Sequence, residues 1–169
     1  MLKMLVNAAL FQVAWFAAVL GAAGGRTWLG PLVLLPVLAV NLAMTPERRG
    51  EVKLWVAAGM IGLLFDTALV SAGLFAPKRH LFPYPLSPPW MVGLWIGFAA
   101  TLNQSLGWLH GRLLLAALLG AVGGPLTYLG GARLGAADAL PQMAGLVILA
   151  VGWGLVTPLL LTLAKRLRS

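Results

Sequence analysis

One carboxylate stands inside a long uncharged stretch of this sequence. Asp66 lies within residues 54–75, which carry no other charged side chain and exceed the roughly 20 residues that a helix needs to cross a bilayer. A charged side chain at the centre of such a helix costs about 2.5–3.5 kcal/mol on insertion scales, so it normally has a partner or a function. Two interpretations stay open: a neutral, hydrogen-bonded structural acid, or a group that contacts a substrate, a proton or a lipid headgroup.

The side chains expected at the depth of Asp66 carry hydroxyl or indole groups, and they are Thr67, Ser71, Tyr128 and Trp153. The apolar segments offer no Lys or Arg as a counter-ion. We therefore expect Asp66 to contact a ligand or to donate a hydrogen bond within an intramembrane pocket. Tyr128 and Trp153 are expected to form the wall of that pocket.

A second polar group is expected nearer the other face of the membrane. At a rise of 1.5 Å per residue, one level should hold five carboxamides, namely Asn7, Gln12, Asn41, Asn103 and Gln104. Hydrogen bonds between them would hold helices together at about 0.6 kcal/mol each. The alternative is a polar pocket open to the cytoplasmic leaflet. In the preferred interpretation, Asn103 and Gln104 orient the ligand that Asp66 contacts, and Asn7 is a further candidate contact.

These residues must be positioned by helices within a membrane. The 169 residues are 60% hydrophobic and only 9% charged, far from the roughly 25% charged content of a soluble domain. The fold class is therefore all-α, a polytopic membrane helical bundle in a single transmembrane domain spanning residues 1–169. We predict six transmembrane helices, at about 4–23, 28–44, 52–75, 90–109, 113–129 and 142–164. The fourth should pack closely through Gly93, Gly97, Thr101 and Ser105, which recur every four residues.

The distribution of basic residues predicts the orientation. One side of the membrane receives the larger set, Lys3, Arg48, Arg49, Lys53, Arg112, Lys165, Arg166 and Arg168, and the other receives Arg26, Lys78, Arg79 and Arg133. Because cytoplasmic loops are enriched in Lys and Arg, both termini are predicted to be cytoplasmic.

The connection over residues 76–89 is rich in proline and is predicted to be an extended outer loop. Its aromatic residues Phe82 and Tyr84 suit the headgroup level of a membrane. Beside them, Lys78, Arg79 and His80 are candidates for headgroup contacts. The simpler interpretation is that this loop is an interfacial anchor. The more specific alternatives are that it forms a lid over a pocket or a clamp for a lipid phosphate.

Several chemistries lack their reacting groups in this sequence. The net charge of +8 is scattered over loops and the C-terminal tail, which argues against nucleic acid as a partner. There is no cysteine and no recognised hydrolase, kinase or metalloprotease motif. His80 and His110 are predicted to lie on opposite sides of the membrane, so they cannot share a metal. We expect neither a metal nor another cofactor.

The sequence resembles a bacterial inner-membrane family known as domain of unknown function 2878. The residues that carry the resemblance are 7–21, 66–69, 94–95 with Phe98, 102–109, 124–128 and 131–136. The resemblance implies a small polytopic protein, with a role in membrane-lipid modification suggested by neighbouring genes for fatty-acid-modifying methyltransferases. Where this chain has Gln104 and Leu129, the family pattern often has a histidine and a second tyrosine.

We therefore interpret the chain as a multi-pass protein of the bacterial inner membrane that binds lipid or a lipid-modifying enzyme partner through the pocket around Asp66. One alternative is a transporter of a small solute or lipid, which requires a water-filled cavity around Asp66 that reaches one face. The other is a membrane enzyme with Asp66 as general acid or base, which requires a second titratable group within hydrogen-bond reach. The oligomeric state stays open.

Overall fold

The computed structural model describes residues 1–78, 83–139 and 142–168. The regular secondary structure of the described residues is helical, as the sequence predicts, apart from an isolated β-bridge between Pro77 and Ala137. Its α-helices are α1 (Leu2–Ala23), α2 (Leu29–Met44), α3 (Arg48–Ser71), α4 (Pro89–Leu102), α5 (Leu113–Arg133) and α6 (Met143–Leu167), and a short 3₁₀ turn, η1, covers Gly107–Leu109. The predicted contacts of Arg79, His80 and Phe82 lie outside the described residues.

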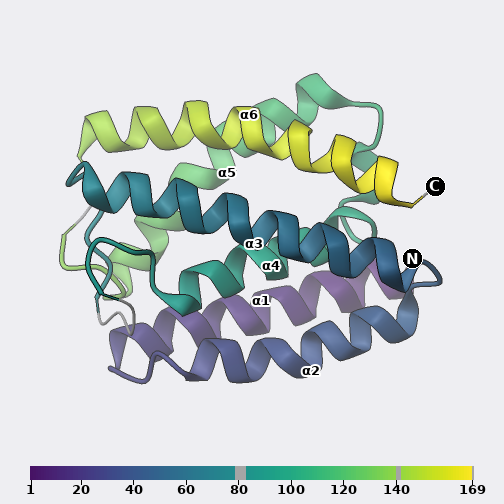
Figure 1. Ribbon diagram of the computed structural model, residues 1–169, viewed down its shortest axis with the longest axis horizontal. Helices are drawn as coiled ribbons and strands as arrows, with labels where there is room; N and C mark the ends of the chain where they lie inside the picture. The colour runs from purple at the N-terminus through teal and green to yellow at the C-terminus, as the bar shows by residue number, and fades with distance from the viewer. Residues whose placement is uncertain (79–82, 140–141, 169) are drawn as a thin grey trace.

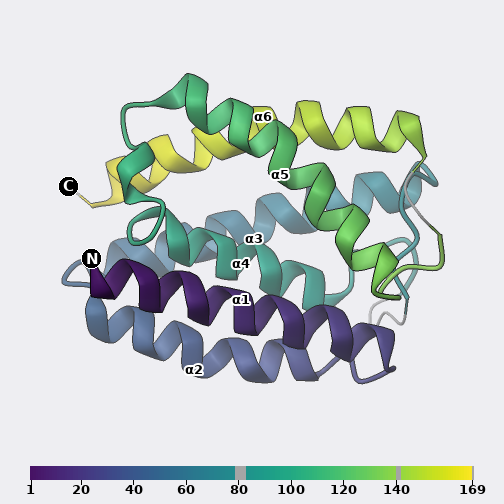
Figure 2. The ribbon, with the colours of Figure 1, turned by 180° about the vertical axis from the view of Figure 1, so that it is seen from behind.

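Most helices run roughly along the long axis of the molecule (Figure 1), and α5 crosses the bundle obliquely (Figure 2). Both termini lie at the same end of the bundle, together with the α2–α3 and α4–α5 connections, and the reverse view shows the same arrangement (Figure 2). We call this end the terminal end and the opposite one the loop end. Helix α4 occupies the interior, where it packs against α1, α2, α3 and α6.

The outer surface of the bundle is suited to lipid. Helices α1, α3, α5 and α6 are long and apolar enough to cross a membrane, and α2 and α4 are shorter apolar helices. Large apolar side chains such as Leu35, Leu64 and Leu114 are more than half exposed. Because helices satisfy their own backbone hydrogen bonds, such a bundle is stable in hydrocarbon. The chain is a helical membrane protein.

Helix ends differ from the predicted boundaries at three places that matter for the site. Helix α3 covers Arg48–Ser71 instead of 52–75, which brings Glu51 into its first turns. Helix α5 continues to Arg133 instead of ending at 129 and has full spanning length.

Helix α4 ends at Leu102 instead of 109. Turns and η1 follow, up to Gly111, which has a φ of +84°. The Ser105 backbone N–H donates to Asn7 Oδ1 at 3.2 Å, so a side chain of α1 takes the place of a helical acceptor beyond the end of α4. Ser105 consequently does not extend the predicted strip of small residues on α4.

Candidate ligand-binding site

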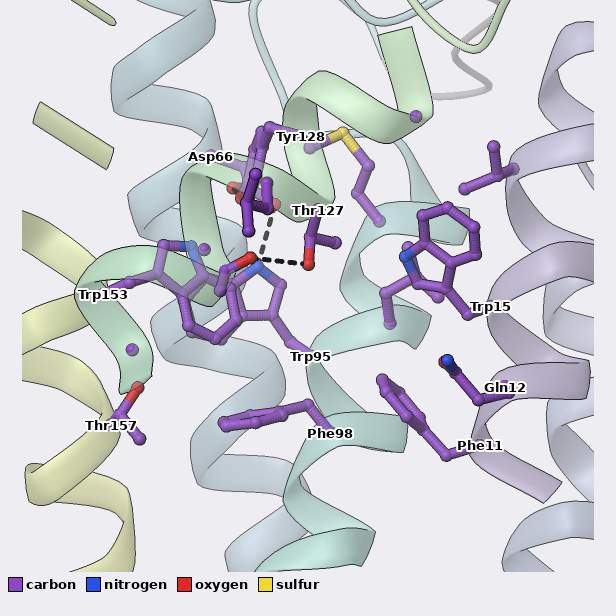
Figure 3. Close-up of a pocket in the computed structure, with 18 of the residues that line it drawn as sticks. Phe11, Gln12, Trp15, Asp66, Trp95, Phe98, Thr127, Tyr128, Trp153 and Thr157 are labelled. Atoms are coloured by element: carbon purple, nitrogen blue, oxygen red, sulfur yellow. Dashed lines mark hydrogen bonds between the residues drawn. The ribbon is translucent and has the colours of Figure 1, made fainter. Parts of the chain in front are cut away.

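A pocket of about 580 Å³ lies between α1, α4, α5 and α6, with one residue of α3 in its wall (Figure 3). Leucines, glycines and many aromatic rings line it. The aromatic residues in its wall are Phe11, Trp15, Phe16, Phe75, Trp90, Trp95, Phe98, Tyr128 and Trp153. Pockets of this size, mostly apolar with a few polar groups, are typical ligand sites.

Asp66 is the residue that α3 contributes to this wall. It is 1% exposed, and at 1.5 Å per residue it lies about 8 Å from the end of α3 at the loop end of the bundle. Trp95 Nε1 donates a hydrogen bond to its Oδ2 at 3.0 Å, and the Tyr128 hydroxyl donates a short one to its Oδ1. Each carboxyl oxygen therefore has a donor, one from α4 and one from α5.

Glycine makes room for Trp95 beside Asp66. Gly62 lies one helical turn before Asp66 on the same face of α3, and the Trp95 ring rests directly on it. A Cβ atom added at Gly62 would stand 2.1 Å from Trp95 Cγ. The absence of a side chain at this position thus fixes where the indole can lie, and with it the hydrogen bond to Asp66.

Trp153 supports the Trp95 ring from the other side. The two indoles stack with their centroids 4.3 Å apart and their planes 18° from parallel, an arrangement worth about 0.5–1.5 kcal/mol beyond the burial itself. Gly124 on α5 lets Trp153 approach, since an added Cβ there would lie 2.3 Å from Trp153 Cγ. The structure thus brings Asp66, Tyr128 and Trp153 together, in the grouping that the sequence suggested.

The loop end of the site is covered by the segment that precedes α4. The Ser87 backbone N–H donates to Thr67 Oγ1 at 3.0 Å, and the Tyr84 hydroxyl donates to the Val70 carbonyl oxygen at 3.3 Å. These contacts fasten the described part of the proline-rich loop over the last turn of α3. Lys78 lies at this end, where its backbone N–H donates to the carbonyl oxygen of Ala136 at 2.9 Å.

The pocket opens sideways between α1 and α5. Phe16, Leu119 and Leu126 line it and are also about half exposed, at 48%, 45% and 59%. Gly123, in the same wall, has no atom within 4 Å of the place where a Cβ would be. Gln12 is an exposed polar group in the same region and extends from α1 toward the cavity in Figure 3.

Three of the predicted ligand contacts lie elsewhere, at the terminal end. Asn103, Gln104 and Asn7 do not line the pocket. Asn103 Nδ2 donates to Glu51 Oε1 at 2.8 Å, and Gln104 Nε2 donates to Thr45 Oγ1 at 2.7 Å. The structure therefore does not bring these residues together with Asp66, because the helix that was expected to present Asn103 and Gln104 ends at Leu102.

The carboxamides fasten helices to one another. Asn7 and Asn41, on α1 and α2, each donate to the Ala100 carbonyl oxygen near the end of α4, at 3.1 and 2.7 Å. Asn7 Oδ1 also accepts bonds from the backbone N–H and the hydroxyl of Ser105, at 3.2 and 2.7 Å. These bonds join helices, as the packing interpretation expects, but they run to Ala100 and Ser105 instead of between carboxamides.

Glu51 is a second buried carboxylate that sequence reasoning missed. It is 1% exposed, although it stands in the sequence among Arg48, Arg49 and Lys53, where a charge normally faces water. Its local sequence carries no signal that separates it from a solvated residue. Only the approach of the turn after α4, with Asn103 as donor, reveals its burial.

His110 extends the Glu51 cluster toward the surface. Its Nε2 lies 3.2 Å from Asn103 Oδ1. Partial burial lowers the pKa of His110, and the positive charge of Arg168 lowers it further. Over the described ranges, no three His, Cys, Asp or Glu side chains come together as metal ligands.

Comparison with known proteins gives one family. The model of a family described as protein of unknown function (DUF2878) matches residues 4–159. No curated protein and no solved structure matches the chain.

Proposed function

The chain belongs to the DUF2878 family of unknown function, and we propose that it binds a lipid-like ligand in the pocket beside Asp66. In this proposal the protein is an accessory component of membrane-lipid modification in the bacterial inner membrane. It takes the ligand from the bilayer and holds it for a lipid-modifying partner enzyme.

The observation that carries the proposal is a largely aromatic and aliphatic pocket with a sideways opening. A cavity of about 580 Å³ accommodates part of a lipid, and its mouth at Phe16, Leu119 and Leu126 lies on an apolar outer surface. A ligand entering there comes from the hydrocarbon layer and not from water. The buried polar group at Asp66 supplies orientation, as the few polar groups of apolar pockets usually do.

The proposal includes six membrane crossings with both termini in the cytoplasm. Helices α2 and α4, at 16 and 14 residues, are about 24 and 21 Å long, shorter than the roughly 30 Å of hydrocarbon. Both nevertheless run alongside the four longer helices (Figure 1). The terminal end also carries the larger set of basic residues, which favours the cytoplasmic side.

Cysteine labelling tests this topology, because the natural chain contains no cysteine. Arg26→Cys, at the loop end, should react with a membrane-impermeant maleimide added to intact spheroplasts. Glu47→Cys, at the terminal end, should react only after permeabilisation. Both parent side chains are exposed. The opposite pattern would reverse the proposed orientation.

Ligand binding is tested by filling the pocket. Gly123→Phe places a ring where the structure leaves open space, so it should occupy the pocket without disturbing the fold. Val122→Phe is the matched control, because Val122 is 61% exposed and does not line the pocket. Native mass spectrometry with lipid identification should show bound lipid in wild type and Val122→Phe, and a loss in Gly123→Phe. Equal lipid retention in all three proteins would refute the site.

One observation favours a second function, a membrane enzyme. Tyr128 is a titratable group in direct hydrogen-bond contact with Asp66, as general acid–base chemistry at Asp66 requires. The pair could pass a proton to or from a ligand in the pocket. Incubation of the purified protein with a lipid extract, followed by mass spectrometry, should then reveal a product that Tyr128→Phe does not form. Absence of any product with the wild-type protein would leave binding alone.

A further inference from the structure

We propose that the pocket selects cations, specifically an ammonium or quaternary ammonium group carried on a hydrophobic body. This inference rests on the proposed binding function and names the class of ligand. The inference is drawn from two features of the pocket: a carboxyl group without a counter-ion in the described part of the chain, and walls made of aromatic rings.

The described residues that line the pocket include an acidic side chain but no basic one. Among the described residues that line it, Asp66 is an acid and there is no Lys, Arg or His. The two groups bonded to Asp66, the Trp95 N–H and the Tyr128 hydroxyl, are neutral donors. They satisfy the oxygens without adding a positive charge, so the carboxyl group has no counter-ion among the described residues when it is ionised. A cation in the pocket would balance that charge in a region of low dielectric constant, where such interactions are stronger than in water.

The aromatic rings favour the same sign of charge. The face of an aromatic ring is the negative part of its quadrupole, and cages of such rings recognise quaternary ammonium groups. Trp15, Phe98 and Trp153 come from α1, α4 and α6 and surround the cavity in Figure 3. An anion would lie among aromatic rings and near a buried carboxyl group, so the pocket should discriminate against it.

Asp66 acts from behind these rings. At 1% exposure its oxygens are almost sealed by Trp95 and Tyr128, so the cation would lie against the rings and not on the carboxylate itself. An uncharged ligand would gain the apolar contacts but would leave this charge without a partner.

Two probes of similar shape and opposite charge test the inference. Tetraphenylphosphonium and tetraphenylborate are added to the full chain in nanodiscs of zwitterionic lipid, and quenching of tryptophan fluorescence is measured. Nanodiscs containing a transmembrane peptide with one tryptophan correct for partition into lipid. We expect the cation to bind the wild-type protein at least roughly tenfold more tightly than the anion.

Two substitutions separate the effect of the Asp66 charge from the effect of the pocket volume. Asp66→Asn keeps the side-chain shape and an acceptor for Trp95 but removes the charge, so it should weaken binding of the cation roughly tenfold or more and should not weaken binding of the anion. Gly123→Phe should weaken binding of both probes, and Val122→Phe should weaken neither. Size-exclusion chromatography confirms that each variant is folded.

A lipid arm identifies the source of the cation. Native mass spectrometry compares retention of phosphatidylethanolamine with that of phosphatidylglycerol carrying the same acyl chains. A preference for the ethanolamine lipid that is lost in Asp66→Asn supports the inference with a lipid headgroup as ligand. Selective binding of tetraphenylphosphonium without that preference supports it with a free lipophilic amine.

The experiments distinguish a failure of cation selection from a failure of the proposed lipid binding. Equal affinity for the two probes, or unchanged binding of the cation in Asp66→Asn, overturns cation selection and leaves lipid binding intact. If no probe and no lipid responds to Gly123→Phe, the proposed binding function falls together with the inference.

Discussion

Replacing Gly62 by alanine should displace the indole that holds Asp66. The new Cβ would lie 2.1 Å from Trp95 Cγ and 2.3 Å from Cδ1, where an ordinary contact begins at 3.4 Å. The ring must therefore retreat by about 1.3 Å, measured along the Cβ–Cγ direction. Gly152 and Gly124 offer no relief, because Phe65 and Trp153 already occupy the space over them.

The energetic cost has two parts. Overpacking of this kind costs about 1–3 kcal/mol, and leaving Oδ2 of Asp66 without its donor costs about 1–3 kcal/mol more. The better helix propensity of alanine returns about 1 kcal/mol. The net loss of stability should be about 1–5 kcal/mol, which for a chain of this length corresponds to a fall in Tm of about 2–20 °C.

Gly59→Ala is the matched control. Gly59 lies on the same helix and also faces α4, but its added Cβ would meet Ile96 Cγ1 and Cδ1 at 3.2 and 3.3 Å and Val92 Cγ1 at 3.7 Å, with no contact under 3.0 Å. Thermal unfolding in detergent should leave Gly59→Ala near wild type and lower the Tm of Gly62→Ala. The near-ultraviolet circular dichroism of the stacked indoles should weaken in Gly62→Ala alone. If the two variants have equal Tm and unchanged spectra, Trp95 is not held as described.

Three smaller perturbations follow from the same contacts. Tyr128→Phe removes one donor to Asp66 and should lower stability by about 1–3 kcal/mol in detergent unfolding; no change would show that the hydroxyl is dispensable. Asn103→Ala removes the donor to Glu51 and should destabilise the protein by a similar amount while leaving ligand binding to the pocket intact, since the terminal-end cluster is separate from it. The pKa of His110 is lowered from its ordinary value of 6.5, chiefly by burial, so the unfolded chain binds the proton more readily than the folded one and stability should fall as the pH drops below 6.5. His110→Gln should flatten that part of the pH profile of Tm, and an identical slope would assign it to other groups.

Much of the fold could be predicted because the membrane imposes it. Apolar stretches of spanning length can only be helices there, and the breaks between them are marked by proline, glycine and charge. Asp66, Tyr128 and Trp153 could be grouped because each lies on a regular helix, whose depth follows from the 1.5 Å rise.

The rest of the site could not be predicted, because it depends on where helices end and on which side chains of different helices come into contact. Asn103 and Gln104 were placed on a helix that stops at Leu102, because a polar residue in an apolar stretch does not by itself reveal whether its side chain or the backbone takes the hydrogen bond. Trp95 was missed as the partner of Asp66. Its signal was Gly62, which leaves a gap one turn from the acid for a large side chain of another helix to fill.

The sideways opening of the pocket between α1 and α5 determines which molecules a ligand must compete with. A molecule that reaches the pocket through the bilayer competes with acyl chains present at very high local density, and the vacant state is therefore rare. Hydrophobicity alone cannot distinguish the ligand from the bilayer lipids, since all of them are hydrophobic. Discrimination must come from the aromatic walls and from the buried carboxyl group of Asp66 behind them, and exchange of ligands is governed by their abundance in the leaflet rather than in the surrounding water.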